Sequence, residues 1–151
     1  MSELKQQVET LRASIDILVR VLKITDRLEI LDCGVRLNPS DTQALLHIRM
    51  NAQCISAEIG QLLNVVPTTT STIVDRLVNN GLVQRERTDL NRRVVLLSLT
   101  QRGEKIAQKI LEEQRLHCRL MLEVLGAGER LRFVNSLEKI ASEIDVRMHK
   151  K

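Results

Sequence analysis

Hydroxyl side chains gather in one short segment, residues 67–72, which reads PTTTST and holds five hydroxyls in six positions. Pro67 suits the first position of a helix, because an amide hydrogen is not needed there. In such a helix Ile73, Val74 and Leu77 must pack inward, which leaves a polar face outward. Short hydroxyl side chains and the free amides of a helix start suit contacts with base edges and phosphates of DNA. The expected readout residues are Thr68, Thr69, Ser71, Thr72 and Arg76.

Arginines follow within two short runs, LVQRER at residues 82–87 and RRVVLLSL at residues 92–99. The second run is rich in β-branched and aliphatic residues and a polar TDLN separates the two, so an antiparallel hairpin is expected. Residues 67–105 carry seven cations against four anions, which gives +3 of the formal net charge of +4. Arginines near a hairpin tip can reach phosphates or a narrow minor groove. The expected wing residues are Arg85, Arg87, Asn91, Arg92 and Arg93.

Each of these signals has a simpler explanation when it stands alone. A threonine run can act only as a helix cap and polar surface, and scattered arginines are usually solvated. A hydroxyl-headed helix followed directly by an arginine-bearing hairpin is a rarer combination. It indicates a helix-turn-helix with a wing, whose partner is double-stranded DNA.

Helical periodicity precedes the hydroxyl segment. Apolar residues from Leu4 to Leu22 recur at steps of four and three, which predicts a long first helix to about Leu31, with a break at Gly34. Ser40 is expected to cap a second helix, and Ser56 a short third one.

The chain after the hydroxyl segment is also punctuated. Gly81 is expected to stop the fourth helix in a left-handed conformation, and Thr100 to cap a fifth helix after the hairpin. Gly126 and Gly128 separate that helix from a last one. The predicted fold is mainly α with a small β-hairpin.

One domain, residues 1–151, is expected, because the chain is of ordinary domain length. Within it, residues 37–103 form the winged helix-turn-helix lobe, and residues 1–36 and 104–151 are dimerisation helices. The apolar stripes of the terminal helices need a partner, and a second copy is the natural one. The alternative is that they pack on their own chain. The expected dimer residues are Leu4, Val8, Leu11, Ile15, Val134, Leu137 and Ile144.

Two motifs, DRLVNNGLVQRE and NRRVVLLSLTQRG, resemble the recognition helix, wing and following helix of the MarR family of transcription regulators. The resemblance covers about residues 37–107 and extends more loosely to both ends. It implies a triangular homodimer with intertwined terminal helices, a repressor role, and regulation by a small ligand, metal or oxidant near the junction of the lobes.

The wing departs from the family pattern at one position. MarR wings usually carry an aspartate, one residue and then an arginine, and here Asn91 stands at the aspartate position with Arg93 as the arginine. Asparagine can hydrogen-bond the arginine but offers no charge-assisted pair, although Asp89 could take its place. The rigidity of the wing is therefore open.

Cysteine and histidine give weaker signals. Cys33 or Cys118 could sense an oxidant if exposed near cations, and a redox-responsive regulator is kept as an alternative. Cys33, His47, His117 and Cys118 show no tight ligand spacing, so neither a metal site nor a cofactor is expected.

Catalysis is not expected, because the sequence has no glycine-rich phosphate loop, nucleophile elbow or paired histidine motif. A helical dimeric adaptor that binds protein and not DNA is the second alternative. With one Phe and no Trp or Tyr, a small organic effector would meet a pocket of aliphatic side chains.

The chain is expected to be soluble and cytoplasmic, without a membrane partner. No apolar run approaches the roughly 20 residues that cross a bilayer, and the first residues, MSELKQQVET, lack the blocks of a secretory signal. Three cysteines, odd in number and far apart, fit a reducing compartment.

Overall fold

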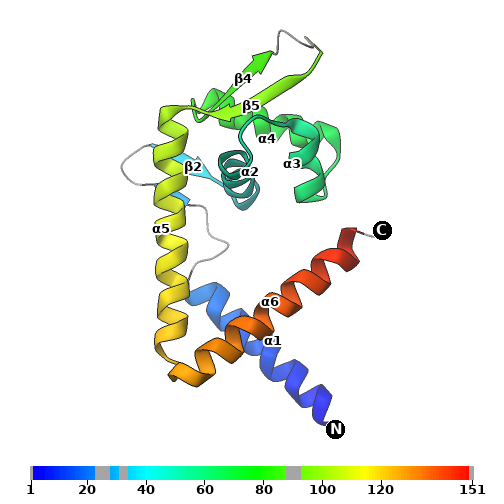
Figure 1. Ribbon diagram of the computed structural model, residues 1–151, viewed down its shortest axis with the longest axis vertical. Helices are drawn as coiled ribbons and strands as arrows, with labels where there is room; N and C mark the ends of the chain where they lie inside the picture. Colours follow the sequence, from blue (N-terminus) through cyan, green and yellow to red (C-terminus); the bar gives the residue numbers. More distant parts are fainter. Residues whose placement is uncertain (1, 23–27, 31–33, 88–92, 150–151) are drawn as a thin grey trace. The chain divides into compact units, whose positions relative to one another are not determined.

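The computed structural model describes residues 2–22, 28–30, 34–87 and 93–149 of the 151-residue chain (Figure 1). Its residues form two compact units, 1–111 and 112–151. In chain order the elements are α1 (Glu3–Val21), β1 (Leu28–Ile30), β2 (Val35–Leu37), α2 (Pro39–Met50), β3 (Cys54–Ile55), α3 (Ser56–Leu63), α4 (Pro67–Asn79), β4 (Val83–Arg87), β5 (Val95–Leu99), α5 (Gln101–Glu123) and α6 (Ala127–His149). The predicted class, mainly α with a winged helix-turn-helix, is confirmed.

The first helix is shorter than the sequence predicts. The helix expected to about Leu31 ends at Val21, and Leu28–Ile30 is a strand that pairs antiparallel with β2. In β2 the exposure alternates, with Val35 and Leu37 buried and the residue between them exposed, which is the two-residue period of a strand. The expected helix was therefore wrong at residues 28–30.

Two helix caps also differ from expectation. At α2 the cap is Asn38 and not Ser40: its Oδ1 accepts from the Asp41 amide at 2.9 Å, and Asp41 Oδ2 accepts from the Asn38 amide at 3.2 Å. This reciprocal pair satisfies two amides, where a serine hydroxyl would satisfy one. At α3 Ser56 is the first helical residue, and the amide of Ile55 donates to Glu58.

The core of the first unit joins every element of the winged lobe. Five fully buried side chains come from α2, α3, α4, β5 and α5 respectively: Leu45, Ile59, Leu77, Leu97 and Ile106. Strand β3, which the sequence did not predict, pairs with β5 and makes the hairpin a three-stranded sheet in the order β3-β5-β4. Helices α2, α3 and α4 are thereby packed against one another and against strands of the lobe.

The start of α5 lies against the chain that leaves α4. Thr100 caps α5 as expected: its Oγ1 accepts from the Gly103 amide at 3.0 Å and donates to the Gly81 carbonyl at 2.7 Å. Gly81 has the expected left-handed conformation, with φ of 69°. The Thr100 amide donates to the Leu82 carbonyl at 3.0 Å. A Cβ at Gly103 would lie 2.0 Å from that carbonyl oxygen, so only glycine fits there.

In the second unit, the turn between α5 and α6 is closed by hydrogen bonds. Gly126 donates its amide to Glu129 Oε2 at 2.8 Å, and Arg130 Nε donates to the carbonyls of Leu122 and Leu125 at 2.7 and 2.9 Å. These bonds satisfy carbonyls that the end of α5 leaves open. Among the helices of the described residues, none is both long and apolar enough to cross a membrane.

The contact at Gly103 gives a stability prediction. Alanine is favoured over glycine by about 1 kcal/mol inside an ordinary helix. At position 103 the added methyl group would overlap the Leu82 carbonyl, so we expect Gly103→Ala to lower the free energy of unfolding by about 2 kcal/mol in urea denaturation. Gly128→Ala in α6 is the control, because its Cβ would meet nothing within 4 Å and stability should be equal or higher. Equal stability of both variants would contradict the close approach.

Candidate nucleic-acid interface

Helices α3 and α4 form a tight helix-turn-helix. Residues 64–66 join them, Asn64 has a left-handed φ of 50°, and the Val65 amide donates to the Gly60 carbonyl at 3.1 Å. The two helices approach closely at Gly60, where a Cβ would lie 2.8 Å from Thr70 Oγ1. The missing side chain of Gly60 therefore sets the spacing of the two helices.

The first two turns of α4 present the hydroxyl segment. Four of its hydroxyl residues, Thr68, Thr69, Ser71 and Thr72, are exposed as expected, whereas Thr70 is buried and donates to the Val66 carbonyl at 3.2 Å. Thr72 Oγ1 donates to the Thr68 carbonyl at 3.0 Å, so the hydroxyl oxygen can still accept a hydrogen bond. The exposed face thus begins at a helix N-terminus, whose free amides carry partial positive charge.

Arg76 lies on the same helix but binds inward. Its Nη2 and Nε donate to Asp41 Oδ1 at 2.6 and 3.0 Å, and Nε also lies 3.2 Å from Oδ2. The Asp41 side chain is only 2% exposed, against 43% for Arg76. This ion pair joins α4 to α2, so the structure gives Arg76 a positioning role, and its readout role remains a prediction.

The wing is the hairpin of β4 and β5, which Figure 1 shows beside α4. Arg85 donates to the Asp75 carboxylate and thereby links β4 to α4. Arg87 and Arg93 are exposed, at the far end of β4 and just before β5. Asn91 and Arg92 lie outside the described residues.

Sequence reasoning missed several residues that hold this arrangement. Arg49 joins α2 to α5 through Glu104 Oε1 at 2.7 Å and Gln108 Oε1 at 3.0 Å. Arg102 Nη1 donates to the Asn80 carbonyl at 2.8 Å, next to the end of α4. The N-x-x-D spacing of Asn38 and Asp41 could have revealed the cap, but no local signal links Asp41 to Arg76.

The cysteines lie in different surroundings. Cys54 is buried in β3, and burial together with the nearby Glu58 carboxylate raises the pKa of its thiol to about 11, so the thiol stays protonated at neutral pH. Cys118 is exposed on α5 and borders a shallow hollow lined by Arg115, Arg119, Leu122, Glu123 and Arg130. Cys33 lies outside the described residues.

A three-residue turn between two packed helices, followed by a hairpin tied to the second helix, defines a winged helix-turn-helix protein. The family description "Winged helix DNA-binding domain" matches residues 37–103. YsmB, an uncharacterized HTH-type transcriptional regulator of Bacillus subtilis (strain 168), is 31% identical over 87 residues, 58% of this chain and 60% of that protein. The match therefore spans less than two thirds of that relative's length.

Solved structures extend the likeness to nearly the whole chain. The crystal structure of MarR superposes with a TM-score of 0.68 at 25% identity, covering 99% of this chain and 97% of that one. Streptococcus pneumoniae FabT, crystallised in complex with DNA, has the same fold, with a TM-score of 0.76 at 18% identity over 93% and 97% of the two chains. Residues 37–103 therefore form a winged-helix DNA-binding domain, and the chain is similar in fold to MarR.

The ion pair of Asp41 with Arg76 gives a prediction about the stability of the fold. Arg76→Met keeps the apolar stem but leaves the buried Asp41 carboxylate without its cation, so we expect the free energy of unfolding to fall by about 2–3 kcal/mol in urea. Arg85→Met is the control, because its ion pair with Asp75 is exposed on both sides and should contribute less than about 1 kcal/mol. If both variants lost the same free energy of unfolding, the buried Asp41 carboxylate would not need Arg76 as its cation.

Proposed function

We propose that the chain is a sequence-specific repressor that binds a pseudo-palindromic operator as a homodimer and is released by a small organic effector. In this proposal residues 37–103 are the DNA-binding lobe, and residues 1–36 and 104–151 are the dimerisation helices. The observation that carries it is the exposed hydroxyl face of α4, at a helix N-terminus and beside the arginine-bearing wing.

The exposed face of α4 suits the major groove. A helix fits that groove, threonine and serine are short enough to bring it close to base edges, and the first amides of α4 can bind a phosphate. Arg87 and Arg93, both exposed, would lie against phosphates or the minor groove next to it. FabT, a protein of the same fold, was crystallised in complex with DNA, which supports DNA as the partner.

The exposed apolar residues of the terminal helices support the dimer. Helix α1 has no buried residue, and the seven expected dimer residues keep between 43% and 69% of their surface exposed: Leu4, Val8, Leu11, Ile15, Val134, Leu137 and Ile144. Each such side chain contributes about 1.5–3 kcal/mol when it is fully buried. A second copy presents the same stripes and can cover them by two-fold symmetry.

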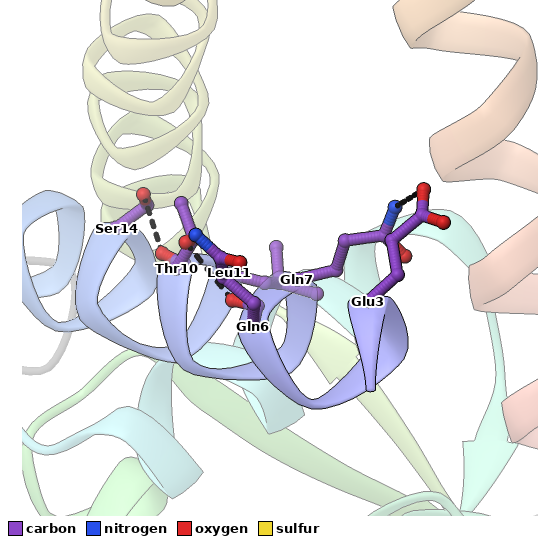
Figure 2. A pocket seen from close by; sticks show the side chains of 6 residues that line it. All are labelled: Glu3, Gln6, Gln7, Thr10, Leu11 and Ser14. Carbon is purple, nitrogen blue, oxygen red and sulfur yellow. Dashed lines mark hydrogen bonds between the residues drawn. The ribbon is translucent and has the colours of Figure 1, made fainter. Parts of the chain in front are cut away.

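A hollow on α1 also needs a second wall. Figure 2 shows the six residues that line it, all from this one helix: Glu3, Gln6, Gln7, Thr10, Leu11 and Ser14. The polar ones bond within the helix, as when Ser14 Oγ donates to the Thr10 carbonyl at 2.8 Å. A single helix cannot enclose a small molecule, so an effector site that uses this hollow would take its other wall from a partner chain.

DNA binding is tested by fluorescence anisotropy with a duplex from the region upstream of the gene and an unrelated duplex. We expect the upstream duplex to bind more tightly, with an affinity that falls at least tenfold between about 50 and 200 mM salt. No binding to either duplex, in the presence of reductant and chelator, would favour the protein-binding adaptor. Binding that an oxidant abolishes, and that Cys118→Ser protects, would favour the redox-responsive regulator.

The wing predicts a graded set of affinities. We expect Arg93→Ala to weaken binding of the upstream duplex by about tenfold or more, and Asn91→Asp to change it only modestly, because the carboxylate can order Arg93 but adds a negative charge near DNA. Arg132→Ala on α6 is the control and should bind normally, since that arginine lies outside the lobe. Normal binding by Arg93→Ala would exclude the wing assignment.

The α1 stripe gives a prediction on assembly. The double variant Leu11→Asp, Ile15→Asp places two charges on the stripe, so we expect its sedimentation equilibrium to shift from dimer toward monomer. Ile17→Asp is the control, because Ile17 is equally exposed but faces away from the stripe by helical geometry. If the double variant stays dimeric, the apolar stripe of α1 is not part of the dimer interface.

A further inference from the structure

Three side chains with metal-binding atoms meet where α2, β3 and α3 join. His47 lies in the last turn of α2, Cys54 in β3 and Glu58 in the first turn of α3. A ring nitrogen of His47, the Sγ of Cys54 and a carboxylate oxygen of Glu58 all lie within 4.8 Å of one another. The group runs from the buried thiol, through the half-buried imidazole, to the exposed carboxylate.

His47 carries an independent sign that something is bound here. Among the described residues its Nε2 is the buried side-chain nitrogen or oxygen that has no hydrogen-bond partner. Leaving such an atom unsatisfied is costly, and native proteins rarely tolerate it without a reason. A cation on Nε2 would supply the missing partner.

The donor set selects the kind of cation. One imidazole nitrogen, one thiolate sulfur and one carboxylate oxygen suit Zn²⁺ and similar thiophilic divalent ions, and not Mg²⁺ or Ca²⁺, which prefer oxygen alone. Three protein ligands leave a fourth tetrahedral position for water. The geometry points to a Zn²⁺ site formed by His47, Cys54 and Glu58.

The neighbouring bonds fit this assignment. Glu58 Oε2 accepts from the Ile55 amide at 3.2 Å, which orients the carboxylate and leaves Oε1 for the ion. Asn51 Nδ2 lies 3.3 Å from His47 Nδ1 and donates to the His47 carbonyl. In the loaded form Nδ1 keeps its proton and the Asn51 amide turns its oxygen to it, as second-shell groups do for metal-bound histidine.

Binding changes the site in two ways. Cys54 loses its thiol proton to solvent as the sulfur takes the cation, so one proton is released for each thiolate bond formed. The ligand atoms must also draw together to about 3.5 Å, the spacing around a tetrahedral Zn²⁺. The ion would then link α2, β3 and α3 directly, and through β3 it would reach β5 of the wing sheet.

The test uses the full-length protein without a histidine tag, freed of metal by a chelator and kept reduced. Titration with Co²⁺ should give a thiolate-to-cobalt charge-transfer band and tetrahedral d–d bands that saturate at one ion per chain. Zn²⁺ should displace Co²⁺ and raise the melting temperature by mass action. Neither readout involves DNA, so the outcome is separate from that of the proposed function.

The variants identify the ligands. Cys54→Ser should lose the charge-transfer band, whereas Cys118→Ser, the control at the exposed cysteine, should keep it. Because Cys54 is buried and its variant can fail to fold, Glu58→Gln is the second probe. It keeps an oxygen for the Ile55 amide and should weaken Co²⁺ binding by about tenfold or more. No band in the wild type, a band that Cys118→Ser abolishes, or unchanged affinity in Glu58→Gln would overturn the site.

Discussion

The buried carboxylate of Asp41 is the constraint on which the winged lobe depends. It closes the cap of α2 with Asn38 and receives the guanidinium of Arg76 from α4, so one side chain fixes the start of one helix and the rotation of another. Asp75, next to Arg76, points to a different side and pairs with Arg85 of the wing. Consecutive helical residues point about 100° apart, so α4 is held on two sides and its hydroxyl face turns outward.

Close contacts at two glycines supply the second constraint. Gly60 lets α4 approach α3, and Gly103 lets α5 pass the carbonyl of Leu82. At both positions a methyl group would meet an oxygen at less than 3 Å, so the two glycines fix spacings that the charged pairs alone would not define. Helix α4 is thus positioned by ion pairs that set its rotation and by Gly60, which sets its distance from α3.

The sequence predicted those features that depend on residues close together in the chain. The PTTTST helix start, the stop at Gly81 and the cap at Thr100 each depend on residues a few positions apart, and all three are observed. Strands β1 and β3 have three and two residues, too few to show a period against the longer helical pattern. The pair of Asp41 with Arg76 spans 35 residues, and His47, Cys54 and Glu58 lie on three elements, so folding alone brings them together.

The distribution of burial separates the lobe from the terminal helices. Among the residues whose burial the structure describes, the buried apolar ones run from Val35 to Ile110, and α1 buries none of its nineteen residues. A lone helix of that length is marginal in water, because nucleation is costly and packing normally supplies the stability. In the proposed homodimer, formation of α1 would therefore be coupled to association. Because two lobes on one operator bind more tightly than one, operator binding would then depend on the protein concentration through the folding of α1.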